Sequence, residues 1–118
     1  MFFCESRLRI FLYGAPCDMR KSFHGLVALA KNAMGQDPLS GHLFVFVNRR
    51  GNQLKALYWD RTGFCIWSKL LSQGSFVSNW QLVRGQEMDY TQLKLFLEGI
   101  EKRHQKKRFR LSSRIQME

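Results

Sequence analysis

The chain has 118 residues, of which 45% are hydrophobic, and a formal net charge of +10 at pH 7. That length suits a single hydrophobic core, and ten Phe, three Tyr and three Trp exclude a wholly disordered chain. The excess of positive charge favours a polyanionic partner, so nucleic acid, an anionic membrane surface and an acidic protein all remain open.

The positive charge is concentrated near the C-terminus. Residues 102–118 contain seven Lys and Arg against one acid, Glu118, whereas residues 1–101 carry a net charge of only +4. We therefore predict a single domain over residues 1–101, followed by a basic tail over residues 102–118 that is either flexible or an extension of a helix. Such a tail gives salt-sensitive affinity for phosphates. Its expected nucleic-acid contacts are Lys102, Arg103, Lys106, Lys107, Arg108 and Arg110.

The three cysteines, Cys4, Cys17 and Cys65, are odd in number and form no CxxC or Cys/His cluster. This pattern favours reduced thiols in the cytoplasm and predicts no bound metal. Charges at residues 5, 7 and 9 interrupt the apolar start of the chain, so we expect neither a signal peptide nor a membrane-spanning segment there.

The first part of the chain predicts a strand and then a helix. Residues 8–13 form a β-prone run that a Gly-Ala-Pro turn signal closes. Apolar residues at helical spacing then predict a helix over residues 22–34, with Ser22 as its N-cap. Gly35 suits the left-handed conformation that ends a helix.

Three β-rich runs follow within residues 43–71, separated by two connectors of the form Asn/Asp-Arg-x-Gly at residues 48–51 and 60–63. Because Asn and Asp bond their own backbone and Gly tolerates positive φ, each connector favours a type I turn with a glycine bulge. We therefore predict an antiparallel meander whose two turns lie at opposite ends, covered on one face by the preceding helix.

The last part of the chain predicts a second helix. Residues 74–86 show no period, and we expect a loop or a short strand there. From residue 90 apolar residues recur at helical spacing, Asp89 with Gln92 matches a capping box, and Gly99 is the candidate end. The predicted apolar face holds Tyr90, Leu93, Leu97 and Ile100. The predicted fold class is α+β: a single domain with an antiparallel meander of three or more strands packed against one helix, and a second, C-terminal helix.

The sequence gives no pattern for catalysis. Its nine acids are scattered, and its three histidines have no spacing that pairs them with a nucleophile or a metal. No phosphate-binding loop, dinucleotide fingerprint or serine elbow is present. We expect no enzyme activity, no cofactor and no metal site.

Arg20 and Lys21 are candidate nucleic-acid contacts because they arrive at the predicted helix start, where free backbone N–H groups already favour phosphate. A bound anion would offset the unfavourable position of two cations beside the positive end of the helix dipole. The alternative is that both side chains face solvent or pair with Asp18.

Arg49, Arg50 and Arg61 are further candidates and lie at the two turns of the meander. Since those turns are expected at opposite ends of the sheet, the three arginines need not form one patch, and ordinary charged turn residues are the alternative interpretation. The tryptophans either belong to the core or stack on exposed bases; they are Trp59, Trp67 and Trp80.

Several blocks of the sequence together resemble a known family. They are PCDMRKSFHGL at residues 16–26, the pattern NRRG…YWDR…GF..W within residues 35–71, and GSF at residues 74–76. This combination is similar to the TnpB accessory protein of insertion sequence 66 family elements, the product of their second open reading frame. The resemblance covers residues 2 to about 100, so the basic tail extends beyond it.

The resemblance implies a bacterial mobile-element protein that is encoded beside a separate DDE transposase and is needed with it for transposition. It implies no catalytic role for any residue. Together with the charge, it predicts an accessory protein for transposition that binds element DNA or the transposase–DNA complex. The alternative is a protein–protein adaptor that docks on the transposase without binding DNA directly.

Overall fold

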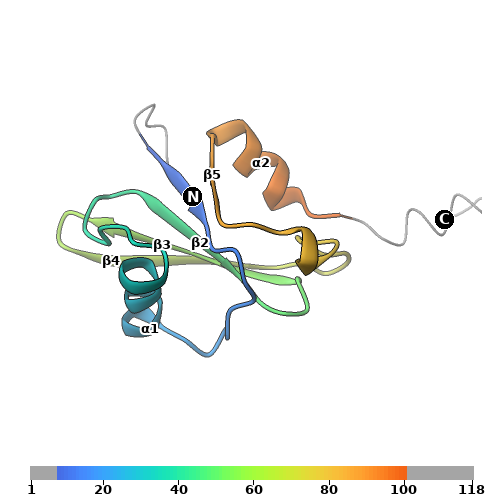
Figure 1. Cartoon of the computed structure of the whole chain (residues 1–118), viewed down its shortest axis with the longest axis horizontal. Coiled ribbons are helices and arrows are strands. Elements are labelled where there is room, and N and C mark those ends of the chain that lie inside the picture. Colours follow the sequence, from blue (N-terminus) through green and yellow to red (C-terminus); the bar gives the residue numbers. More distant parts are fainter. Residues whose placement is uncertain (1–7, 101–118) are drawn as a thin grey trace, which may run out of the picture.

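The computed structural model describes residues 8–100, which form one five-stranded sheet with a helix on each face (Figure 1). The strand order is β4-β3-β2-β1-β5. The strands are β1 (Ile10–Leu12), β2 (Leu43–Val47), β3 (Gln53–Asp60), β4 (Gly63–Leu70) and β5 (Gln86–Met88). The helices are α1 (Phe23–Ala28), the π-helix η1 (Leu29–Ala33), the short 3-10 helix η2 (Trp80–Leu82) and α2 (Tyr90–Glu98). The predicted α+β class is confirmed.

Strands β2, β3 and β4 form the predicted antiparallel meander. Its register is continuous: Phe44 to Val47 pair with Leu57 back to Leu54, and all eight residues of β3 pair with β4. Strand β1 extends the sheet on the other side, parallel to β2 and antiparallel to β5. These last two pairings make the sheet mixed.

The two turns of the meander differ, although their sequences look alike. Gly51 has a φ of +79° and its N–H donates to the carbonyl of Asn48 over 2.9 Å, in agreement with the predicted glycine turn. The glycine bulge predicted at residues 60–63 is wrong, because Gly63 belongs to β4 and pairs with Asp60. Only two residues remain for that turn, and Arg61 takes the left-handed conformation with a φ of +53°.

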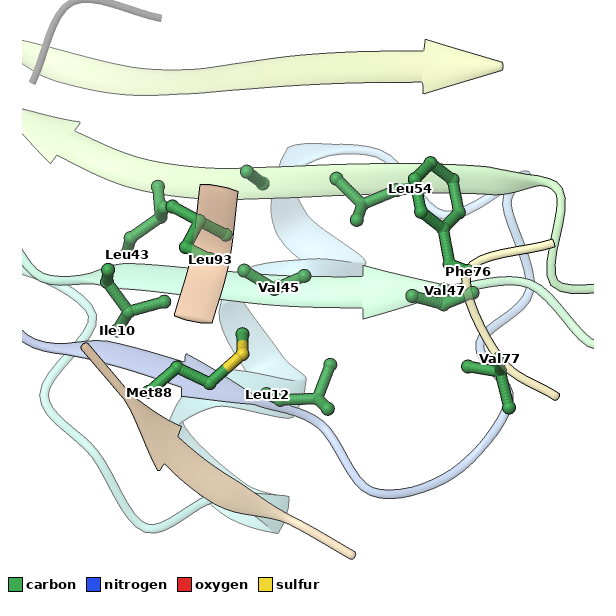
Figure 2. Close-up of a cluster of buried hydrophobic side chains, with 11 residues drawn as sticks. Ile10, Leu12, Leu43, Val45, Val47, Leu54, Phe76, Val77, Met88 and Leu93 are labelled. Carbon is green, nitrogen blue, oxygen red and sulfur yellow. The ribbon is translucent and has the colours of Figure 1, made fainter. Parts of the chain in front are cut away.

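The core lies on both faces of the sheet, so β2 is buried along its whole length. The cluster on the α1 face includes Phe44, Phe46 and Leu26. On the other face, Leu93 of α2 lies over β2 beside Leu43, while Phe76 lies near the end of β2 and β3 (Figure 2). Two covered faces explain why the strands lack a strict alternation of apolar and polar residues.

Helix α1 confirms part of the prediction for residues 22–34. The helical segment runs from Phe23 to Ala33, but its second half is the π-helix η1. Gly35 has the predicted positive φ, +66°. Ser22 is the N-cap residue, as predicted, but its side chain makes no capping hydrogen bond.

Helix α2 begins at the predicted capping box, in which the Asp89 carboxylate accepts from Gln92 N and the Gln92 side chain accepts from Asp89 N. It ends at Gly99, which has a φ of +79°. The predicted apolar face is only partly correct. Leu93 is buried, but half of Tyr90 is exposed. Phe96, which the predicted face did not include, is partly buried and stacks on Phe76.

Candidate nucleic-acid interface

The turn at residues 48–52 holds Arg49 and Arg50 in a defined position. The Asn48 side chain accepts from Gln53 N over 3.0 Å and donates to Asn52 Oδ1 over 2.8 Å. These bonds fix the backbone on both sides of the two arginines, and both side chains are exposed. Among residues 8–100, ion pairs join only Arg9 to Glu87 and Arg20 to Asp18, so no acid of this part neutralises the turn.

The segment around Ser75 holds this turn from behind. Gly51 O accepts from Phe76 N over 2.6 Å and from the buried Ser75 hydroxyl over 3.3 Å. Trp80 adds a third contact, because its Nε1 donates to Arg49 O over 2.9 Å. Gly51 is itself buried, and a Cβ at that position would clash with Ser75 Oγ. The turn is therefore anchored through its backbone, while its arginine side chains remain available.

Ser75 also binds the end of the domain. Its N–H donates to Ile100 O over 2.9 Å, and Ile100 N donates back to Ser75 O over 2.6 Å. Ile100, the last described residue, therefore lies at the same end of the sheet as the turn. The predicted tail contacts lie outside the described residues: Lys102, Arg103, Lys106, Lys107, Arg108 and Arg110.

Arg20 and Lys21 reach the same end of the sheet from the α1 face. Cys17 N donates to Val47 O over 2.8 Å, which holds their loop beside the end of β2. Lys55 of β3 reinforces this position, because its Nζ donates to the carbonyls of Met19 and Lys21. We call the loop at residues 17–21, the turn at residues 48–52 and Ile100 the basic end.

The alternative interpretation of Arg20 agrees with the structure. Its guanidinium forms a bidentate pair with Asp18, with NH2 2.8 Å from Oδ2 and Nε 3.1 Å from both carboxylate oxygens. Hydrogen bonds from the Arg20 side chain and backbone lower the pKa of the exposed Asp18 carboxyl from 3.8 to about 2. This partner offsets the charge of Arg20, whereas Lys21 is exposed without an ion pair among the described residues.

Arg61 lies at the other end of the sheet. The β3–β4 turn that carries it is separated from the β2–β3 turn by the eight residues of β3, about 25 Å of extended chain. The expectation that Arg49, Arg50 and Arg61 need not form one patch agrees with this arrangement. Arg61 therefore serves as an internal control for the basic end.

The three tryptophans are partly buried, which favours the interpretation that they belong to the core. Trp67 and Trp80 are partly buried and pack against the cluster on the α2 face. Trp59 is also partly buried, and its ring meets Phe64 edge to face with 4.9 Å between the centroids. None of these three rings forms part of a row of exposed aromatic side chains.

The link between the turn and Ile100 was not predicted from the sequence. Ser75 and Ile100 join the turn to the tail, but their segments gave only an aperiodic stretch and the end of a helical pattern. The one signal at Ser75 was the GSF block, which contributed to the family resemblance without indicating a contact.

The described residues contain no group of three or more His, Cys, Asp or Glu side chains placed to hold a metal ion. Over the same part of the chain, no helix is both long and apolar enough to cross a membrane.

Comparisons with known proteins agree on one family. The family model described as "IS66 Orf2 like protein" matches residues 8–107. The chain is 33% identical to the uncharacterized protein y4hO of Sinorhizobium fredii (strain NBRC 101917 / NGR234), over 87% of this chain and 90% of y4hO. It is 40% identical to y4jC of the same strain over 59% of this chain, spanning 60% of y4jC. No solved structure matches the chain.

The family match corrects the expected extent of the resemblance. It continues past residues 99–100, where the family pattern was expected to end, and reaches residue 107. The first six residues of the basic tail, which include Lys102, Arg103, Lys106 and Lys107, therefore lie within the family region. Arg108 and Arg110 lie beyond it.

Proposed function

The chain belongs to the IS66 Orf2-like family, the accessory proteins of IS66 transposition, and on that premise we propose that its basic end binds the DNA of the element. Family membership implies an association with the element's transposase, so the DNA is bound either alone or as the transposase–DNA complex. Family membership alone specifies neither DNA as a direct partner nor the surface that binds it.

The observation that carries the proposal is the pair of bonds between Ser75 and Ile100, together with the bonds from Phe76 N and Ser75 to Gly51 O. They bring Ile100, which precedes the basic tail in the sequence, to the same end of the sheet as Arg49 and Arg50. Several cations that neutralise neighbouring phosphates release counterions together, which gives affinity without base recognition. Lys21 adds a cation from the other face of the sheet.

Fluorescence anisotropy with a labelled duplex from the element end tests the proposal. Affinity should fall linearly with the logarithm of salt concentration, with a slope that counts phosphate contacts. Replacing Arg49 and Arg50 together by Ala should reduce that slope by about one for each arginine lost. Arg61→Ala is the matched control, since the same type of side chain is removed from the opposite turn, and its slope should not change.

Two results would contradict direct DNA binding by the basic end. One is a lack of affinity for duplex or single-stranded DNA at low ionic strength. The other is an equal loss of affinity in the Arg61→Ala control, because this would mean that total charge matters and position does not.

The adaptor alternative is favoured by a cleft of about 600 Å³ beside β1 and β5. Phe11, Tyr13 and Met34 contribute apolar surface to it, and the ion pair of Arg9 with Glu87 lies at its rim. A cleft of this size accepts a few side chains of a docking partner. If the chain acts only as an adaptor, the transposase should be retained in a pull-down after nuclease treatment, and Ala33→Trp, which fills the cleft, should abolish retention.

We also propose that the chain carries no catalytic centre of its own. Two of the nine acids have local structural partners: Asp18 pairs with Arg20, and Asp37 accepts from Leu39 N over 3.0 Å. Incubating the chain with supercoiled plasmid and Mg²⁺ or Mn²⁺ tests this, since a nuclease would need acids that converge on a metal. Cleavage that follows the chain through purification and disappears when one of its acids is replaced by the matching amide would overturn the proposal.

A further inference from the structure

Strand β4 forms one edge of the sheet over eight residues. It pairs with β3 along its whole length without a bulge, and within the described residues it has no second neighbour. Exposed edges of this length are usually shortened, bent by a bulge, or interrupted by Pro or outward charges, because they pair with other chains. The sequence of β4, GFCIWSKL, has none of these features except Lys69.

The register shows which backbone groups of β4 are free. Asn48 N donates to Gln53 O, so in β3 the odd-numbered residues from Gln53 bond to β2, and the even-numbered residues bond to β4. The even-numbered residues of β3 pair with the odd-numbered residues of β4. The outward N–H and C=O groups of β4 consequently belong to Phe64, Ile66, Ser68 and Leu70.

Side chains along this edge leave it open. The charged atom of Lys69 is held on the α2 face, where Nζ donates to Leu97 O over 2.8 Å. Leu70 is 66% exposed although it is a large apolar side chain in a regular strand. An open ladder with an exposed leucine at its end fits a β-strand partner that offers an apolar side chain at the matching position.

We propose that β4 pairs antiparallel with β4 of a second copy of this chain, which joins the two sheets into one of ten strands. One symmetric register places every outward residue opposite another: Phe64 faces Leu70 of the second copy, and Ile66 faces Ser68 of the second copy. The exposed leucine then packs on an aromatic ring, a favourable cross-strand pair. Trp67 meets Trp67 of the second copy at the two-fold axis, and Lys69 faces Cys65 rather than another charge.

The expected dimer is weak and depends on salt. One ladder of eight residues buries less than the roughly 1,200 Å² of a standard stable interface. Each copy also carries a net charge of +10, so the two copies repel one another at low ionic strength. Salt should therefore strengthen the dimer, whereas it weakens binding to DNA. This opposite dependence separates failure of the dimer from failure of the proposed function.

Sedimentation velocity on the full chain in high salt, from about 1 to about 500 μM, should show a monomer–dimer equilibrium in the range of weak interfaces. Ser68→Pro is the selective variant. It removes an outward N–H that the β3 ladder does not use, and Pro is tolerated at such edge positions. Its dimer Kd should rise by about tenfold or more, while the matched control Ser68→Ala should stay within about twofold of the unchanged chain.

Hydrogen exchange on the unchanged chain gives a readout that needs no variant. The amides of Phe64, Ile66, Ser68 and Leu70 should exchange fast in dilute protein and slowly in concentrated protein, whereas the amides of Cys65 and Trp67 should be protected at both concentrations. A chain that stays monomeric throughout, or a dimer in which those four amides remain unprotected, would overturn the proposal.

Discussion

Gly51 is the residue on which the geometry of the basic end depends most. Residues other than Gly rarely adopt its φ of +79°, and its backbone lies against Ser75. We expect Gly51→Ala to lower the free energy of unfolding by about 1 to 3 kcal/mol, because the strain of the left-handed backbone adds to a steric clash with Ser75 Oγ. Urea unfolding followed by tryptophan fluorescence measures this loss.

Gly63→Ala is the matched control for that experiment. Gly63 occupies the corresponding place in the other connector, but it lacks the positive φ, and a Cβ there would have no neighbour within 4 Å. We expect a change within about 0.5 kcal/mol. Equal losses in the two variants would mean that the left-handed conformation and the contact with Ser75 do not distinguish the two turns.

The pair of Asp18 and Arg20 predicts a dependence on pH. The pKa of Asp18 is about 2 in the folded chain and 3.8 ordinarily, mainly because the Arg20 side chain donates to the carboxylate. The folded state therefore holds this carboxylate ionised more strongly than the unfolded chain does. The contribution of the pair to stability is present above pH 3.8 and is lost as the pH falls toward 2.

Carbon-detected NMR titration of the Asp18 carboxyl measures this pKa directly. We expect a midpoint near 2 in the unchanged chain and a return toward 3.8 in Arg20→Gln, which keeps an N–H donor at the place of Nε but removes the charge and the terminal guanidinium nitrogens. An unchanged midpoint in Arg20→Gln would show that Arg20 does not hold the carboxylate.

At the scale of elements, the N-cap residues of the two helices can be compared for their contribution to stability. Asp89 caps α2 through a complete capping box, whereas the Ser22 side chain makes no bond to α1. Asp89→Ala should lower the free energy of unfolding by about 1 kcal/mol, and Ser22→Ala should change it by less than about 0.5 kcal/mol. Chemical unfolding of both variants checks the difference, and similar losses would contradict it.

The elements predicted correctly are those determined by neighbouring residues. The meander was predicted from two connectors, each of which separates one apolar run from the next. The start of α2 was predicted from Asp89 and Gln92, which are three residues apart. Such signals act over a few residues and hold where no distant contact overrides them. For the same reason the glycine turn at residues 48–51 was predictable from its sequence.

Other elements depend on distant partners and could not be predicted from local patterns. The β5 segment, Gln86–Met88, is a strand because it pairs with β1 more than seventy residues earlier in the sequence. Gly63 became part of β4 because the ladder with β3 continues to Asp60. Ser75 is buried because it bonds Gly51 and Ile100. In each case the tertiary contact decides the local conformation.

At the scale of the whole molecule, the structure separates two kinds of surface. The basic end lies where β2 passes into β3, whereas the β4 edge runs along the side of the sheet (Figure 1). A two-fold axis at Trp67 reverses the strand direction, so pairing of two β4 strands would place the two basic ends at opposite extremities of the joined sheet. Each copy would then meet DNA without blocking the other.

The bonds of Ser75 to Ile100 predict that turn and tail act as one site. If the turn and the tail contact the same stretch of DNA, the tail raises the effective concentration of that DNA at the turn. Removing residues 102–118 would remove this effect and weaken the contact between the DNA and the turn. The loss of affinity from replacing Arg49 and Arg50 by Ala should then be smaller in the truncated chain than in the full chain. Arg61→Ala, at the other end of the sheet, should cost the same in both chains.

A double-mutant cycle measures this coupling from anisotropy at one fixed salt concentration. Groups that share one ligand segment typically couple by about 0.5 to 3 kcal/mol, whereas independent groups add within about 0.5 kcal/mol. We expect coupling of this size between the Arg49–Arg50 pair and the tail. The effects of removing Arg61 and the tail should be additive. Additive losses in both cycles would mean that the tail binds DNA independently, and that its starting point beside the turn has no effect on affinity.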